Sequence, residues 1–261
     1  LWHDVANGMY RFNGTHWQSV NEFIIRKSFE HMYDVRNNEE KSIIDKVKVQ
    51  TTDENEPMPN QKECFNVANG TIYFDKNNPD EPYKFERNHI KDYCDYCQEY
   101  DYNPKADDSK IKLFLHQIFA NHPSGEENMV NRFKEYLGSL FNPTNIEGKA
   151  IMWIGDGSNG KSKLNEIIEK MLGDSLCCAI PVEALSREFR LQSLIGKWVN
   201  FFHDPKPDTS ENENIMKNLC TNDKITTNVK NKEPVSFHPR ASIFIDANEC
   251  FHPKDKTNGW Q

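Results

Sequence analysis

Alternating apolar and polar residues open the chain. Residues 9–12 and 15–18 alternate on either side of Asn13-Gly14. An Asn-Gly pair between two such runs is typical of a tight turn that joins antiparallel strands. Residues 64–75 repeat this pattern around Asn69-Gly70. The sequence therefore predicts two β-hairpins in its first part.

Apolar residues at helical spacing mark three further segments, residues 22–33, 111–120 and 129–140. Each places apolar side chains three or four positions apart, as on one face of a helix. Asn142-Pro143 ends the third of them, because a residue before proline disfavours helical backbone. Residues 35–62 are polar and charged, which indicates a long loop or a poorly covered helix with a linker.

The pattern changes after residue 141. Residues 150–154 form a continuous apolar run, which is typical of a strand buried on both faces. Strand-like and helical segments then alternate, which favours an α/β layer architecture. We predict three parts: residues 1–62, a hairpin and helix with a charged linker; residues 63–141, an α+β accessory domain; and residues 142–261, an α/β core.

Composition narrows the class of protein. The 261 residues include 32 basic and 40 acidic side chains, a net charge of −8. This balance excludes a generally basic nucleic-acid binder but permits a local basic surface. No apolar run reaches the ~18 residues that a membrane span requires, and the first residues lack a secretory signal. We therefore expect no membrane partner and a cytoplasmic or nucleo-cytoplasmic location.

The cysteines add little to this picture. There are seven, and Cys94-x-x-Cys97 has the spacing of half a zinc site or of a redox pair. No second pair follows at zinc-site spacing. We expect ordinary free thiols in a reducing compartment.

The strongest chemical signal is the segment Gly-Asp-Gly-Ser-Asn-Gly-Lys-Ser at residues 155–162. It fits G-x-x-x-x-G-K-[ST], a loop that cradles nucleotide phosphates between a strand and a helix. Residues 163–172 predict that helix. Lys161 would reach the β- and γ-phosphates of ATP, and Ser162 would bind Mg²⁺. The predicted nucleotide-binding residues are Gly155, Gly157, Asn159, Gly160, Lys161 and Ser162.

Polar residues at two strand ends would complete a nucleotide-hydrolysing site. Residues 196–204 are strand-like and end in Asp204, the candidate acid that organises Mg²⁺ and the attacking water. Residues 241–247 predict another strand, and Asn248 follows it as a candidate sensor of the γ-phosphate. Each signal is weak alone, because strands often end in a turn with Asp or Asn. With the loop, they give Lys161, Asp204 and Asn248 as candidate catalytic residues.

These three elements, in this order and spacing, resemble the superfamily 3 helicases. The likeness is greatest to the primase–helicases of poxviruses, other large DNA viruses and satellite phages or plasmids. It covers about residues 60–261 and includes the hairpin at 65–74, Leu194-Ile195-Gly196-Lys197 before the acidic strand, and Asn248-Glu249 with Pro253. The resemblance implies a P-loop, AAA+-like ATPase core that acts as an ATP-dependent DNA helicase in replication.

The resemblance also implies partners. The working form would be a ring, a homohexamer, around single-stranded DNA, with a primase domain or a polymerase as a further partner. Residues 215–226 would belong to the segment that lines the DNA channel. Lysines at a hairpin tip would meet DNA phosphates without reading sequence, although a solvated loop is the alternative. The basic residues there are Lys224, Lys230 and Lys232, with Arg240 just beyond.

The chain departs from the family pattern in its second and third motifs. The second motif usually has two acids, or a small polar residue and Glu, whereas this chain has His203-Asp204. The shorter Asp204 would have to take the place of Glu. The third motif, Asn-Glu-Cys-Phe-His-Pro, is longer than usual.

The family's arginine finger would follow Gln261, which together with the start at Leu1 leads us to expect a fragment. These departures leave a nucleotide-binding DNA scaffold without efficient turnover as an alternative. A P-loop kinase of a small molecule is a further alternative, although only Arg187 and Arg190 lie between the first two motifs to serve an arginine-rich lid.

Overall fold

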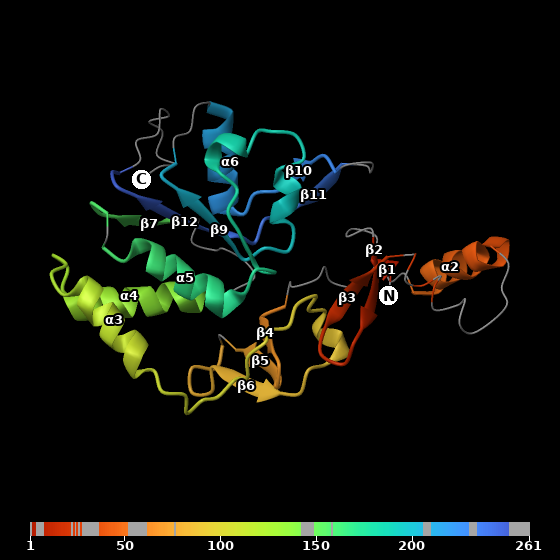
Figure 1. Cartoon of the computed structure of the whole chain (residues 1–261), viewed down its shortest axis with the longest axis horizontal. Coiled ribbons are helices and arrows are strands. Elements are labelled where there is room, and N and C mark those ends of the chain that lie inside the picture. Colours follow the sequence, from red (N-terminus) through yellow and green to blue (C-terminus); the bar gives the residue numbers. More distant parts are fainter. Residues whose placement is uncertain are drawn as a thin grey trace. The chain divides into compact units, whose positions relative to one another are not determined.

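The computed structural model describes residues 2–3, 8–21, 23, 25, 27, 37–51, 62–75, 77–141, 149–157, 159–205, 210–229 and 234–250. The chain forms two compact units, residues 1–102 and residues 103–261 (Figure 1). Each unit has its own sheets.

The first unit contains two antiparallel sheets with the strand orders β1-β2-β3 and β4-β5-β6. The strands are β1 (Trp2–His3), β2 (Gly8–Phe12), β3 (Trp17–Val20), β4 (Cys64–Val67), β5 (Gly70–Phe74) and β6 (Tyr83–Glu86). The pairing of β2 with β3 and of β4 with β5 confirms both predicted hairpins.

Helical segments accompany these sheets. α2 (Asn37–Thr51) lies in the charged region, where a poorly covered helix was one of the two expectations. The predicted helix at residues 22–33 falls largely outside the described residues, although Phe23, Ile25 and Lys27 are helical. A single 3-10 turn, η1 (Ile90–Asp92), follows β6.

A buried amide ties the first unit together. Asn66 of β4 is fully buried, and its Nδ2 donates to the carbonyls of Thr15, at 2.8 Å, and of Tyr96, at 2.9 Å. Its Oδ1 accepts from the Thr71 hydroxyl at 3.1 Å. Because Thr15 lies in the turn of the first hairpin, these bonds join the two sheets.

The second unit is built on a four-stranded parallel sheet with the order β7-β12-β9-β8. Its strands are β7 (Ile151–Ile154), β8 (Cys177–Cys178), β9 (Val199–His203) and β12 (Ser242–Ala247). The last of these strands in the sequence lies between the first and the third. The carboxyl ends of β7, β12 and β9 therefore meet at one edge, which confirms an α/β fold with a parallel sheet.

Helices cover both faces of this sheet (Figure 1). On one face Phe133 of α4 (Glu126–Ser139) contacts Trp153 of β7, with ring centroids 5.9 Å apart, and Trp153 contacts Phe244 of β12. On the other face α6 (Ser210–Thr221) adds Met216 and Leu219 to a core that includes Ile243 and Ile245. β7 differs from its prediction, because Ile154 is 52% exposed while Trp153 is buried.

The remaining elements complete the second unit. They are α3 (Ser109–Phe119), α5 (Lys161–Leu172), the 3-10 turns η2 (Val182–Ala184) and η3 (Leu191–Leu194), and the antiparallel pair β10 (Ile225–Thr227) and β11 (Val235–Phe237). No helix in the described part of the chain is long and apolar enough to cross a membrane.

The two compact units divide after Tyr102, whereas the sequence placed limits at residues 62 and 141. The helices α3 and α4 lie in the second unit for a physical reason. α4 packs on the sheet through Phe133, and Ile118 of α3 lies against Gly160. The three-part division itself stays a prediction.

Candidate functional site

The glycine-rich loop, residues 155–160, connects β7 to α5. The Gly155 N–H donates to the Ala247 carbonyl of β12 at 3.3 Å, so the loop begins against the neighbouring strand. Gly157 and Gly160 have φ angles of +91° and +88°, a region that glycine occupies without steric cost. A Cβ at Gly160 would lie 2.9 Å from Cγ2 of Ile118. Both the backbone and the packing therefore require glycine at residue 160.

α5 starts at Lys161 without a capping side chain, because Gly160 occupies the capping position. An uncapped helix N-terminus carries positive partial charge and unsatisfied N–H groups, which favour an anion. Ser162 lies in this first turn and is exposed. Asn159 places its side-chain amide where a Cβ on Gly155 would be. Ser158 lies outside the described residues.

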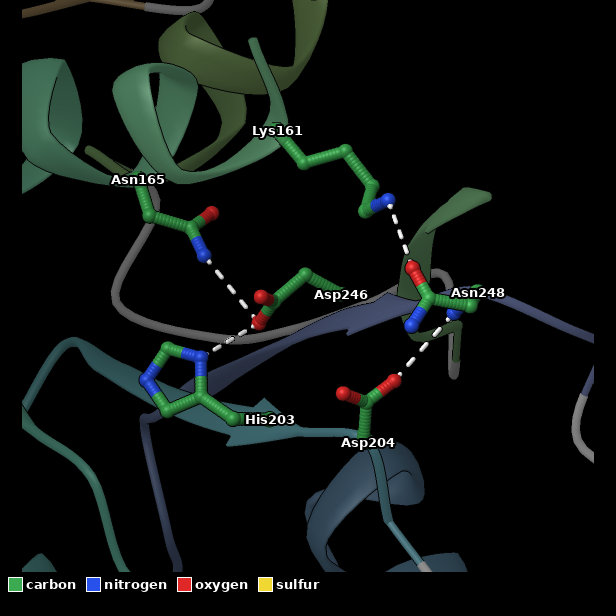
Figure 2. A network of polar contacts seen from close by, with 6 residues as sticks. All are labelled: Lys161, Asn165, His203, Asp204, Asp246 and Asn248. Carbon is green, nitrogen blue, oxygen red and sulfur yellow. Dashed lines mark hydrogen bonds and ion pairs between the residues drawn. The ribbon is translucent and has the colours of Figure 1, made fainter. Parts of the chain in front are cut away.

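The three predicted catalytic residues form one chain of contacts (Figure 2). Lys161 Nζ donates to Asn248 Oδ1 at 3.3 Å, and it also donates to the Gly155 carbonyl. The Asn248 N–H donates to Asp204 Oδ1 at 3.2 Å. Residues from the start of α5, the end of β12 and the end of β9 thus meet at the carboxyl edge of the sheet.

Asp204 has an unusual backbone. It directly follows β9, its φ is +41°, and its N–H donates to the Asp246 carbonyl at 2.8 Å. Positive φ is uncommon outside glycine, and Asp and Asn tolerate it better than longer residues do. The turn directs the Asp204 carboxylate toward the backbone of Asn248.

A second polar cluster lies beside the contacts of Lys161, Asn248 and Asp204, and the sequence did not predict it. The Oδ1 atom of Asp246, on β12, lies 2.6 Å from His203 Nδ1. The same atom accepts a hydrogen bond from Asn165 Nδ2 of α5 at 3.3 Å (Figure 2). The Asp246 side chain is 14% exposed, against 57% for His203. The available signal was a carboxylate inside the apolar run Ile-Phe-Ile-Asp-Ala, because buried acids are rare without partners.

The predicted DNA-binding residues are only partly described. Lys224 is exposed and directly precedes β10, and Lys230 and Lys232 lie outside the described residues. The expectation that Arg240 adds to the basic surface is wrong. Its side chain is 5% exposed, and its guanidinium lies over the Trp198 ring at 3.5 Å from the centroid. This stacking holds Arg240 inside the core.

Cys94 contacts the thiol of Cys64, and both cysteines are free. Its Sγ lies 3.7 Å from Sγ of Cys64 on β4, and both side chains are buried. The hydrogen bond with Cys64 and burial raise the pKa of Cys94 well above its usual value, which keeps the thiol protonated. Within the described ranges, no group of three or more His, Cys, Asp or Glu side chains is arranged to hold a metal ion.

A family model and a viral protein each match part of this chain. Residues 153–259 match a family model described as "Family of unknown function (DUF5906)". Over 174 residues the chain is 28% identical to "Putative helicase L207/L206" of Acanthamoeba polyphaga mimivirus. That alignment covers 62% of this chain and 18% of the viral protein, so the chain spans about a fifth of that relative.

Two solved structures that resemble part of this chain are of the C-terminal region of NrS-1. "The A form apo structure of NrS-1 C terminal region-CTR" is 19% identical with a TM-score of 0.46, over 58% of this chain and 38% of that one. "The apo structure of NrS-1 C terminal region (305-718)" is 17% identical with a TM-score of 0.44, over 57% and 38%. By sequence, this chain is homologous to part of the viral protein named "Putative helicase L207/L206".

Proposed function

We propose that this chain is the P-loop, AAA+-like ATPase core, with its preceding segment, of a superfamily 3 DNA helicase that acts in viral, phage or plasmid replication. The observation that carries the proposal is the contact chain from Lys161 through Asn248 to Asp204. It joins a phosphate-loop lysine, a strand-end amide and a strand-end acid at one edge of a parallel sheet. The homology to the viral protein named "Putative helicase L207/L206" supports the same assignment.

The residues of the site take distinct roles in this proposal. Residues 155–162 bind the phosphates of ATP, with Lys161 toward the β- and γ-phosphates and Ser162 toward Mg²⁺. The ion would neutralise charge that develops on the phosphates. Asp204 orients and polarises the attacking water, and Asn248, which Lys161 already contacts, senses the γ-phosphate.

The proposal also includes an assembly of several subunits. A ring, a homohexamer, would place each site against a neighbouring subunit that supplies an arginine finger. Lys224, Lys230 and Lys232 would meet the backbone of single-stranded DNA inside the ring, and hydrolysis would move them along the strand. Such contacts are electrostatic and therefore salt-dependent.

One observation favours a second candidate function, a nucleotide-binding scaffold on DNA that does not turn over efficiently. His203 occupies the position before Asp204 where the helicase family carries an acid or a small polar residue. Single-turnover hydrolysis by the oligomer on single-stranded DNA separates the two functions. DNA-stimulated turnover supports the helicase, and nucleotide binding without turnover supports the scaffold.

The test of the proposed function is Lys161→Ala. Removing the phosphate-facing ammonium should lower ATP hydrolysis by ~10²-fold or more, because such charges act where transition-state charge develops. The matched control is Lys163→Ala, on the same helix turn, since Lys163 is exposed and pairs with Glu166 at 2.5 Å. Steady-state ATPase assays of both variants provide the measurement, and full activity of the Lys161 variant would reject the proposal.

A further inference from the structure

We propose that Asp246 supplies the carboxylate that faces the nucleotide-bound Mg²⁺ in this chain, with His203 as the residue that positions it. Asp204 is then left to act on water. This inference rests on the proposed function and deepens it, because it divides between two acids what the sequence assigned to Asp204 alone.

The sheet register places Asp246 at the required point. Its partners across the sheet are His203 on β9 and Trp153 on β7, the strand that leads into the glycine-rich loop. Neighbouring residues in register point to the same face. Asp246 therefore lies one strand nearer to the loop than residue 203, on the face that α5 covers.

α5 makes the connection to the magnesium-binding turn. Asn165 contacts Asp246 at 3.3 Å and stands three residues after Ser162, so both residues share one face of the helix. The carboxylate thus contacts α5, the helix whose first turn carries the predicted magnesium ligand, and Figure 2 shows this contact through Asn165.

Unused polar atoms at this point fit an ion with its water shell. Asn165 is 3% exposed, and its Oδ1 is buried without a hydrogen-bond partner in the described structure. Both polar contacts of Asp246 use Oδ1, and within the described residues Oδ2 makes no hydrogen bond or ion pair. Mg²⁺ keeps several waters and is commonly held by one or two carboxylates plus phosphates.

His203 is the positioning residue. Its Nδ1 lies 2.6 Å from the Asp246 oxygen that Asn165 also contacts, so the carboxylate is held from β9 on one side and from α5 on the other. Asp204, by contrast, is held by the Asn248 N–H and points toward the proposed γ-phosphate sensor. Asp246 on β12 is thus the register partner of position 203, where the helicase family carries an acid or a small polar residue.

The experiment measures how much Mg²⁺ strengthens nucleotide binding. The full chain is titrated with fluorescent N-methylanthraniloyl-ADP in Mg²⁺ and in EDTA. In Asp246→Asn, which keeps the side-chain shape, the strengthening by Mg²⁺ should fall by ~10-fold or more while the affinity in EDTA stays within ~2-fold of the parent chain. Asp204→Asn should retain the strengthening and lose hydrolysis.

Matched variants separate this role from a purely structural one. Placing the carboxylate back on β9, with His203→Asp in the Asp246→Asn background, should restore the Mg²⁺ effect, whereas His203→Gln in that background should not. His203→Ala alone should reduce the effect, and His203→Asn, which keeps a donor near Nδ1, should recover most of it.

The outcomes are distinguishable. If the parent chain binds no nucleotide in either buffer, the proposed function fails. If the parent binds and Asp246→Asn keeps the full Mg²⁺ effect, or if Asp204→Asn is the variant that loses it, the assignment of Asp246 is wrong while the proposed function stands. Thermal unfolding without nucleotide checks that each variant is folded.

Discussion

Gly160 combines a positive φ of +88° with a neighbour, Ile118 Cγ2, that leaves no room for a Cβ. The two constraints act at the residue where the glycine-rich loop becomes α5. A side chain there would either twist the backbone or push α3 away. The first N–H groups of α5 depend on this position for their direction, so the site depends on the absence of one methyl group.

Gly160→Ala should therefore lower the free energy of unfolding by more than ~1 kcal/mol and weaken ADP binding. Gly138→Ala is the matched control, because an added Cβ there meets nothing within 4 Å in the helix α4. That substitution should raise stability by ~0.5–1 kcal/mol. Urea unfolding of both variants gives the two values, and equal effects of the same sign would contradict the role of residue 160.

Sequence reasoning reached the residues whose side chains belong to a local motif. The loop and its lysine were evident because their spacing is fixed along the chain. Asp246, His203 and Asn165 were not evident as a cluster, because register between β12 and β9 brings two of them together and a helix face adds the third. Arg240 was misplaced for a similar reason: its position over Trp198 depends on tertiary packing.

At the scale of elements, periodicity predicted most of the second unit. The expected helices at 111–120 and 129–140 correspond to α3 and α4, shifted by a few residues at their starts. Strand order was beyond the sequence, because the insertion of β12 between β7 and β9 is a long-range pairing. Short strands such as β8 and β6 lack enough residues to show a period.

One prediction concerns the β10–β11 pair. Lys224 is exposed at its start, and in the proposed function it meets a DNA phosphate. Lys224→Ala should weaken binding of single-stranded DNA uniformly across sequences and reduce the slope of log affinity against log salt by about 1.

The control for this variant is Lys110→Ala, an exposed lysine at the start of α3. Fluorescence anisotropy with oligonucleotides at several salt concentrations measures both slopes. An unchanged slope in the Lys224 variant would remove this residue from the DNA surface.

At the scale of the whole molecule, the chain is two compact units with separate sheets. Each has its own buried core, and the first is tied together by Asn66. Independent cores commonly unfold as separate cooperative steps. The division also separates the proposed nucleotide site, which lies wholly in the second unit, from the hairpins of the first.

Chemical unfolding should therefore show two transitions. Asn66→Leu leaves buried carbonyl and hydroxyl groups without their partner, so it should destabilise the first unit by about 2 kcal/mol and move one transition. ADP with Mg²⁺ should raise the urea midpoint of the other transition only, because a ligand stabilises the unit that binds it. Tryptophan fluorescence and circular dichroism in increasing urea follow both steps, and a single transition shifted by both changes would contradict the separation.

The turn at Asp204 has a consequence for the history of this site. A single nucleotide separates the codons of Asp and Glu, so a change to the longer acid is easily reached by mutation. The positive φ of +41° places a cost of about 1 kcal/mol on residues other than Gly, Asn and Asp. Lineages that keep this backbone should carry Asp, Asn or Gly at position 204, and Glu should occur only where the end of β9 has a different backbone.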